Sequence, residues 1–234
     1  IKKAEKKSKK TIVSIFVNPS QFNKLNDYKR YPRNLTKDLS MLKKLKIDYV
    51  LVPSKKDIFK NKKMMKVKIK PKYKILCAKF RPGHFEGVLG VINQFLKIIK
   101  AKYMFLGEKD FQQVFLIKNY IKKKKFKTKI LTCKTIRYRN YLPFSSRNML
   151  LKPSHISLAS EVSRLVKKFS LLVKKDFKNK DKINDIKKIL KKMNIKLQYF
   201  EIKNRKNLSN KFNKNNFKIF IAYYIKGVRL IDNF

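Results

Sequence analysis

Four consecutive residues, Gly107-Glu108-Lys109-Asp110, bring together the residue types that bind a phosphate group between a strand and a helix. Gly107 gives the backbone freedom to turn from the strand into the helix. The free N–H groups at a helix N-terminus attract an anion, and Lys109 adds a mobile cation. Asp110 is suited to capping the helix, contacting a ribose hydroxyl or holding Mg²⁺, and the sequence leaves these three roles open. A capped turn without any ligand is the alternative interpretation of so short a motif.

A second loop, Phe144-Ser145-Ser146-Arg147-Asn148, carries two hydroxyl groups next to a guanidinium group. Hydroxyl and guanidinium donors in one loop can grip a polyphosphate and stabilise the charge that develops on its leaving group. The alternative interpretation is a polar surface turn. Together, the two loops indicate a site for a nucleoside triphosphate.

Neutral amides stand at two further places where a small substrate could bind. Asn18 and Gln21 follow the first predicted strand, and Gln113 lies near the first turn of the helix after the phosphate loop. Amide groups suit the recognition of hydroxyl and carboxylate groups. His84, which follows a Pro-Gly turn, is more often a capping or packing residue at such a position than a catalyst.

Strands and helices must alternate to position these loops. Short apolar runs predict strands, and helical spacing of apolar residues predicts helices between them. The predicted strands are 11–17, 48–53, 102–106 and 129–136, and the predicted helices are 34–46, 84–100 and 111–124. This alternation predicts βαβ units and a parallel sheet, whose ligands bind beyond the carboxyl ends of the strands.

The pattern changes after about residue 153. Two helical stretches are followed by three short strands, which predicts a second, smaller α+β domain. The helices are predicted at 156–174 and 182–193, and the strands at 197–202, 218–225 and 228–231.

The charge of the chain is its most conspicuous property, with 63 Lys and Arg against 14 Asp and Glu and a net charge of +49. Such a field attracts polyanions, which makes a basic RNA-binding protein one hypothesis. However, the basic residues are spread along the whole chain, and most of them are Lys. Lys, Ile, Asn, Phe and Tyr, which are all abundant here, have A/T-rich codons. We therefore attribute the charge to the base composition of the genome rather than to selection for nucleic-acid binding.

Several classes of protein are excluded by composition. Cys77 and Cys133 are far apart and form no C-x-x-C motif, which argues against a disulfide framework or a zinc ribbon and favours the cytoplasm. No apolar run is long enough to span a membrane, and residues 1–10 lack the apolar core of a secretory signal.

Taken together, the motifs resemble one family closely. S-I-F-V-N-P-x-Q-F (14–22), Y-P-R (31–33), R-P-G-H-F-x-G-V (81–88), F-L-G-E-K-D-F-Q-Q (105–113), S-S-R-N (145–148) and R-L-I-D-N (229–233) occur in the order and spacing of the pantoate–β-alanine ligases, the pantothenate synthetases. The resemblance covers essentially the whole chain from about Thr11.

The resemblance implies a fold and a reaction. The fold is α/β, with a Rossmann-like nucleotidyltransferase parallel sheet at 1–135 and a smaller C-terminal α+β domain at 136–234. The reaction joins pantoate and β-alanine with ATP through a pantoyl adenylate, releasing AMP and pyrophosphate. ATP with Mg²⁺ is the implied co-substrate, and a cytoplasmic homodimer the implied form.

The resemblance also implies the roles of individual residues. Lys109, Ser146 and Arg147 are the expected catalytic residues, and Gln21, Gln113 and Asn18 are expected at the pantoate and β-alanine sites. The expected ATP-binding residues are Gly107, Glu108, Lys109, Asp110, Ile136, Phe144, Ser145, Ser146 and Arg147.

The chain departs from the family pattern at four places. The family's His-x-Gly-His signature would lie upstream of Ile1, and neither His84 nor His155 replaces it by position. One hypothesis is a complete ligase whose start lies further upstream, and another is an inactive remnant. The smaller departures are Cys77-Ala78 in place of Glu-Gly, Asn140-Tyr141 in place of Asp-Gly and Phe144 in place of Leu or Met. A Gly replaced at Tyr141 matters most if that position needs a positive φ.

Overall fold

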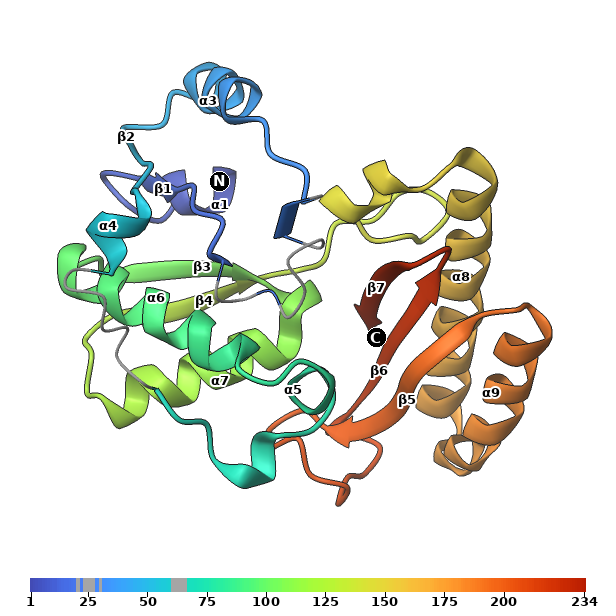
Figure 1. Cartoon of the computed structure of the whole chain (residues 1–234). Coiled ribbons are helices and arrows are strands. Elements are labelled where there is room, and N and C mark those ends of the chain that lie inside the picture. Colours follow the sequence, from blue (N-terminus) through green and yellow to red (C-terminus); the bar gives the residue numbers. More distant parts are fainter. Residues whose placement is uncertain (20–21, 23–27, 30, 60–66) are drawn as a thin grey trace. The chain divides into compact units, whose positions relative to one another are not determined.

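A computed structural model of the chain describes residues 1–19, 22, 28–29, 31–59 and 67–234. Its contacts divide the chain into two compact units, shown together in Figure 1. Unit 1 comprises residues 1–106 and 112–133, and unit 2 comprises residues 107–111 and 134–234. The domain division predicted from the sequence, with a break at 135–136, stays a prediction. The predicted division placed residues 107–111 in the first domain, whereas the contacts place them in unit 2.

Unit 1 contains the four strands predicted for the first half of the chain. β1 (Ile12–Ser14) pairs in parallel with β2 (Tyr49–Leu51), with Val13 opposite Val50. β3 (Tyr103–Gly107) pairs with β4 (Lys129–Cys133) in a separate two-stranded sheet. β1 and β2 are shorter than predicted because the chain leaves the sheet before Asn18-Pro19 and Pro53.

Three helices of unit 1, α3 (Leu35–Lys44), α6 (His84–Ile98) and α7 (Phe111–Lys123), follow the predicted amphipathic stretches. The short helices α1 (Lys2–Glu5), α4 (Lys55–Ile58) and α5 (Cys77–Phe80) were not predicted. α6 begins directly after Gly83, whose φ of +78° requires a glycine in the turn that feeds the helix. Its Val91 and Phe95 pack with Ile58 of α4.

Asp48 ties the start of β1 to that of β2. Its carboxylate accepts hydrogen bonds from the Thr11 backbone N–H (2.8 Å) and hydroxyl (3.0 Å), and from the Lys10 ammonium (2.9 Å). The bond from Lys10, followed by those from Thr11, lowers the pKa of Asp48 from 3.8 to about 2. The ionised carboxylate is therefore the form that stabilises the folded state.

We expect Asp48→Asn to lower the urea midpoint at pH 5 and to lose this effect in acid. Because the folded pKa lies below the unfolded one, the contribution of Asp48 is present above pH 3.8 and disappears as the pH falls from about 4 towards 2. The measurement is the difference in midpoint between the two proteins across that range. Asp38→Asn, which removes the same charge from α3, is the control. A difference independent of pH would contradict the assignment.

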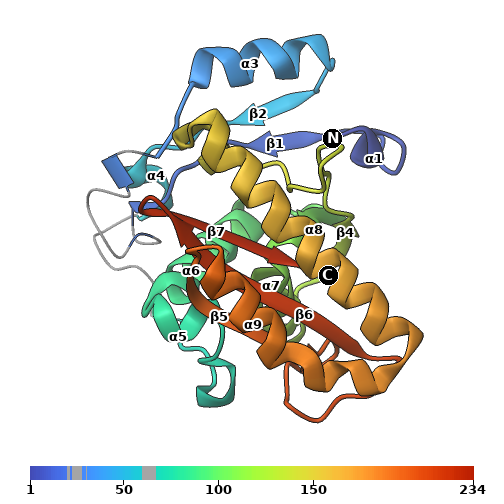
Figure 2. The same cartoon turned by 90° about the vertical axis from the view of Figure 1, so that its right-hand side faces the viewer.

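Unit 2 is an antiparallel sheet with two helices against it. β5 (Lys196–Asn204), β6 (Phe217–Ile225) and β7 (Val228–Asn233) lie in that order, with Ile221 opposite both Phe200 and Asp232. Figure 2 shows α8 (Pro153–Lys175) and α9 (Ile183–Lys192) lying across one face of this sheet. The predicted elements of the second half are thus all present.

The core of unit 2 is formed between these two layers. Every third or fourth residue of α8 is buried against the sheet, as its amphipathic sequence requires. Val162, Val166 and Phe169 are at most 1% exposed and meet Phe200 of β5 and Ile219 of β6 in one hydrophobic cluster.

The described part of the chain contains no helix that is both long and apolar enough to cross a lipid bilayer.

Candidate active site

The predicted phosphate loop joins β3 to α7 through one 3₁₀ turn, Glu108–Asp110. Gly107 has φ −76° and ψ 134°, a conformation that any residue adopts. The turn therefore does not use the backbone freedom that was predicted for Gly107. What Gly107 provides is space: it is exposed, and a Cβ built on it would meet no atom within 4 Å. An approaching ligand could use that space.

Lys109 is the best-placed cation of this loop. Its side chain is 21% exposed, and its ammonium lies 3.9 Å from a carboxylate oxygen of Asp110, whose side chain is 47% exposed. A partly buried ammonium interacts more strongly with a phosphate than a fully solvated one, because water screens it less. Asp110 leaves half of its carboxylate open to solvent beside it.

The backbone of the loop is fixed by the last strand of unit 2. The Asn233 side-chain amide donates to the carbonyl oxygens of Glu108 (3.0 Å) and Lys109 (2.8 Å). Phe111, at the end of the loop, packs edge-on against Phe220 of β6, with ring centroids 5.6 Å apart. The Lys218 ammonium lies 5.1 Å from the centroid of the Phe111 ring, and burial lowers its pKa.

The second predicted loop is fixed by its own polar groups. Ser145 accepts a hydrogen bond from the Arg147 N–H (3.3 Å) and begins the 3₁₀ turn Ser146–Leu150. The buried Asn148 side chain donates to the carbonyl of Pro143 (3.0 Å). These bonds hold Ser146 and Arg147, both half-buried, at the start of a defined turn. Such pre-organised donors suit a polyphosphate.

A tight turn leads into this loop. The Phe144 N–H donates to the Ile136 carbonyl (3.0 Å), and the rings of Tyr138 and Phe144 stack at 3.9 Å with an interplanar angle of 22°. Ile136 (69%) and Phe144 (49%) remain exposed. Together they offer an apolar and aromatic surface at the start of the Ser145–Asn148 loop. Their predicted contacts with ATP stay predictions.

Tyr141 occupies the glycine position of this turn in a left-handed conformation, with φ +70°. We expect Tyr141→Gly to raise the free energy of unfolding by about 0.5–1 kcal/mol, because only glycine adopts this φ without strain. Urea denaturation is the measurement. Tyr141→Ala removes the ring but keeps the strain, so it should not stabilise. Equal effects of the two substitutions would assign the change to the ring instead.

Two of the substrate residues predicted from the sequence, Asn18 and Gln113, lie in unit 1 and differ in their surroundings. Asn18 is 1% exposed and donates its side-chain amide to the carbonyl of Gly87 in α6 (3.2 Å), so that amide holds the end of the first strand region against a helix. Gln113 is half-buried near the start of α7. Its neighbour Gln112 is buried and donates to the carbonyls of Tyr73 and Ile75. Gln21 lies outside the described residues.

His84 behaves as a packing residue. It is 8% exposed, its Nε2 lies 3.1 Å from an Arg81 guanidinium nitrogen, and its ring packs beside Phe85. No group of three His, Cys, Asp or Glu side chains within the described ranges could bind a metal ion.

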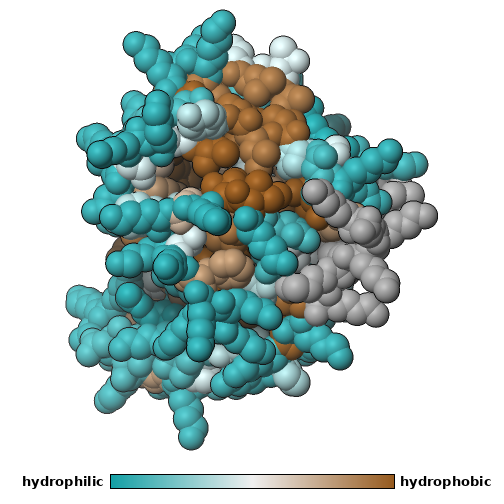
Figure 3. Space-filling model, turned by 90° about the vertical axis from the view of Figure 1, so that its left-hand side faces the viewer, coloured by the Kyte–Doolittle hydropathy of each residue, from teal (hydrophilic) through white to brown (hydrophobic). Residues whose placement is uncertain are grey.

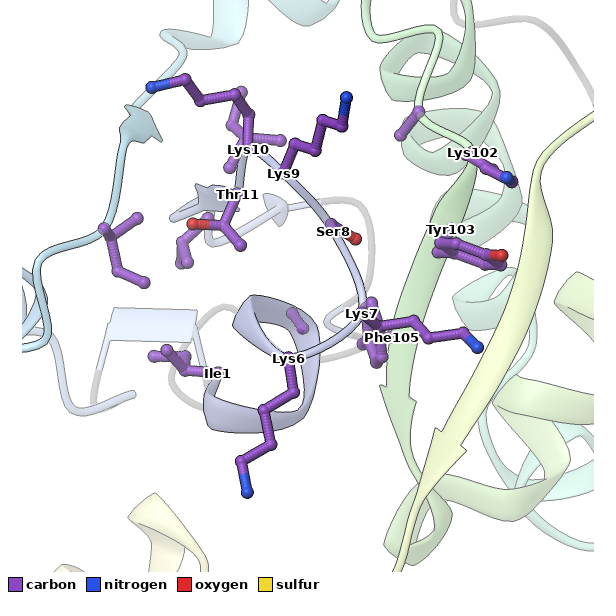
Figure 4. Close-up of a pocket in the computed structure, with 15 residues that line it drawn as sticks. Ile1, Lys6, Lys7, Ser8, Lys9, Lys10, Thr11, Lys102, Tyr103 and Phe105 are labelled. Carbon is purple, nitrogen blue, oxygen red and sulfur yellow. The ribbon is translucent and has the colours of Figure 1, made fainter.

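A hollow of about 720 Å³ in unit 1, lined by parts of β1, β3 and the N-terminal segment, is not the predicted site. None of the predicted ligand residues lines it. Figure 4 shows its lysines, Lys6, Lys7, Lys9, Lys10 and Lys102, with ammonium groups pointing in different directions rather than towards one point. It therefore lacks the convergent charge of an anion site.

Sequence reasoning missed how the two predicted ATP loops are joined. Arg137 bonds Asp232 through both of its terminal nitrogens (2.7 and 2.8 Å) and also donates to the carbonyl of Tyr141 (2.9 Å). Asn233, the next residue after Asp232, holds the first loop. The only signal in the sequence was the closing R-L-I-D-N motif, which carried no assigned role.

Comparisons with known proteins identify the family of the chain. A family model described as pantoate-beta-alanine ligase matches residues 1–234. The pantothenate synthetase of Francisella tularensis subsp. novicida is 40% identical over 237 residues, which cover 100% of this chain and 82% of that protein.

Two solved structures show the same fold. The crystal structure of a pantoate-beta-alanine ligase from Francisella tularensis, complexed with beta-gamma ATP and beta-alanine, is 39% identical, with a TM-score of 0.85 over 100% of this chain and 82% of that one. A pantothenate synthetase from Thermus thermophilus has a TM-score of 0.90 at 24% identity, over 99% of this chain and 85% of that one. The α/β prediction is confirmed, and the chain belongs to the pantoate–β-alanine ligase family.

Proposed function

We propose that this chain condenses pantoate with β-alanine in two steps that use ATP. A pantoate carboxylate oxygen attacks the α-phosphorus of ATP, and pyrophosphate leaves. The β-alanine amine then attacks the acyl carbon of the pantoyl adenylate, an amide bond forms, the amine loses a proton and AMP leaves. The observation that carries this proposal is that hydrogen bonds within one unit join the 107–110 loop, which carries Lys109, to the turn before the 145–148 loop, which carries Arg147.

This reaction needs no nucleophilic side chain, because the substrates are the nucleophiles. The protein must hold the reactants in line and neutralise the charge of the departing pyrophosphate. Lys109 and Arg147 supply positive charge from the two loops, and Ser146 supplies a hydroxyl donor. We assign these three residues as catalytic. We assign the adenine side to the backbone of Ile136, and we place Phe144 with the loop that closes over the phosphates.

The remaining assignments concern the two acids and the metal. We assign Gln113, Gln21 and Asn18 to the pantoate and β-alanine sites. Mg²⁺ is bound by enzymes of ATP mainly through phosphate oxygens and one or two carboxylates. The open carboxylate of Asp110 fits that requirement, and the ion would neutralise phosphate charge when bound.

The comparisons do not favour the two alternatives, an inactive remnant or a basic RNA-binding protein. The test is to incubate the purified protein with ATP, pantoate and β-alanine and to measure pantothenate, AMP and pyrophosphate. We expect the three products in equal amounts. The protein tested should include any residues encoded in frame before Ile1. If this protein formed pantothenate no faster than the reaction without enzyme, the proposal would be refuted. RNA binding that is sequence-selective and survives moderate salt would support a basic RNA-binding protein instead.

We further propose that the protein is a cytoplasmic homodimer. Figure 3 shows hydrophobic residues gathered in one area of a face that is otherwise hydrophilic. Unit 1 exposes large apolar side chains on and beside α3, β1 and β2, namely Ile12, Leu35, Leu39, Met41, Tyr49 and Val52. An exposed apolar area is typical of a protein–protein interface. A monomeric mass by light scattering at micromolar concentration would contradict the dimer.

A further inference from the structure

One network in unit 2 reaches the 107–110 loop and the turn that leads into the second loop assigned to ATP. Its centre is the ion pair between Arg137 and Asp232, whose side chains are 19% and 3% exposed. A bidentate pair of this kind fixes distance and angle together. The ring of Phe234 lies under the guanidinium, with the Arg137 Cζ 4.3 Å from its centroid. Arg137 is thus held on several sides.

One end of the network holds the turn before the second loop, and the other end holds the 107–110 loop. On one side, Arg137 donates to the carbonyl of Tyr141 in the turn before the Ser145–Asn148 loop. On the other side, Arg137 donates to the backbone carbonyl of Asn233 (3.2 Å), and the Asn233 N–H donates to Asp232 (2.8 Å). The end of β7 therefore has a defined position.

The amide of Asn233 has only one favourable orientation. Its NH₂ group faces the carbonyl oxygens of Glu108 and Lys109, and a rotated amide would place its oxygen against them. Its Oδ1 is buried and has no hydrogen-bond partner in the part of the chain that the structure describes. A buried acceptor without a partner costs stability. The side chain keeps this orientation because the two donated bonds determine it.

We propose that Asn233 is a positioning residue, which holds the backbone of 107–110 so that Lys109 faces the ATP phosphates, and that the Arg137–Asp232 pair sets its place relative to the second loop. This proposal rests on the proposed function. Asn233 does not touch the reacting atoms. It acts through the Glu108 and Lys109 carbonyls. Removing the Asn233 amide leaves every charge of the site in place but frees the loop that carries the Lys109 ammonium.

Asn233 is the residue to change. Removing either charge of a buried pair leaves the other unpaired and can unfold the unit. Asn204→Ala is a matched control, because Asn204 is also a buried asparagine of this sheet, 7% exposed, whose amide donates to a loop carbonyl, that of Lys211 (2.9 Å). Both substitutions remove the same groups, and only that of Asn233 touches the 107–110 loop.

The first measurement is hydrogen–deuterium exchange of residues 105–113 without any ligand. We expect exchange there to be at least about fivefold faster in Asn233→Ala and unchanged in Asn204→Ala, since a lost bond lets a segment open locally. Equal exchange in both variants would overturn the proposal. Hydrogen exchange does not depend on activity. Unchanged exchange would therefore refute the positioning role even if pantothenate is formed, and faster exchange would support it even if no pantothenate is formed.

The second measurement separates binding from chemistry. We expect Asn233→Ala to raise the KM for ATP and to lower kcat, each by about tenfold, and to leave the KM for β-alanine within about twofold. Asn204→Ala should change none of these at a temperature where both proteins are folded by circular dichroism. A similar loss of kcat in the two variants would show a general structural effect and overturn the positioning role.

Discussion

Replacing Lys109 by alanine should reduce the rate of pantoyl adenylate formation by about 10²-fold or more. The ammonium lies on the loop that the end of β7 holds in place, and it is partly shielded from water, with its side chain 21% exposed. Removing one such charge contact to a transition state costs about 3–4 kcal/mol. Pyrophosphate release from ATP and pantoate, measured without β-alanine, reports this step alone.

The large net charge makes a control necessary. Lys109 is one of 63 basic residues, so the loss of a single charge changes the overall field only slightly. Lys118→Ala removes an exposed lysine from α7 and should leave the rate within about twofold. If both variants lost activity equally, the effect would come from the general field. An unchanged rate in Lys109→Ala would remove this residue from the mechanism.

Much of the fold could be predicted because each element carries its own local signal. The apolar periodicity of α8 and the apolar run of β6 indicate which residues face the core. Those residues are buried in the structure. Element ends were less predictable. β1 stops at Ser14 although the apolar run continues to Val17, because hydrogen bonding to a neighbouring strand, and not apolar character, decides where a strand ends.

The site was predictable in part, for a related reason. Motifs close together in sequence, such as 107–110 and 144–148, indicate their chemistry through residue type and spacing. The hydrogen bonds of Asn233 to Glu108 and Lys109 join residues more than 120 positions apart, and no local pattern marks such a pair. The φ of Gly107 was not predictable either, because it depends on the path of the chain on both sides of the loop. It lies in the extended region that any residue adopts.

The core of unit 2 supports this long-range network, and Phe169→Ala should show how strongly. Phe169 is 1% exposed in the middle of α8, and its ring lies 5.8 Å from that of Phe200. Truncating a buried phenylalanine removes its transfer free energy and leaves a cavity, and the free energy of unfolding should fall by about 3–5 kcal/mol. Since small domains are stable by about 5–15 kcal/mol, the unit would lose a large part of its stability.

Urea denaturation followed by circular dichroism measures this loss, and Leu171→Ala is the control from the same helix. Leu171 is 50% exposed, so its substitution should change the free energy of unfolding by no more than about 0.5 kcal/mol. The network through Arg137 and Asn233 requires the sheet that α8 covers, because Asp232 and Asn233 end one of its strands. Faster hydrogen exchange at 107–111 should therefore accompany the loss of stability in Phe169→Ala. Exchange there that stayed slow while the rest of unit 2 unfolded would show that the network through Asn233 does not hold the loop.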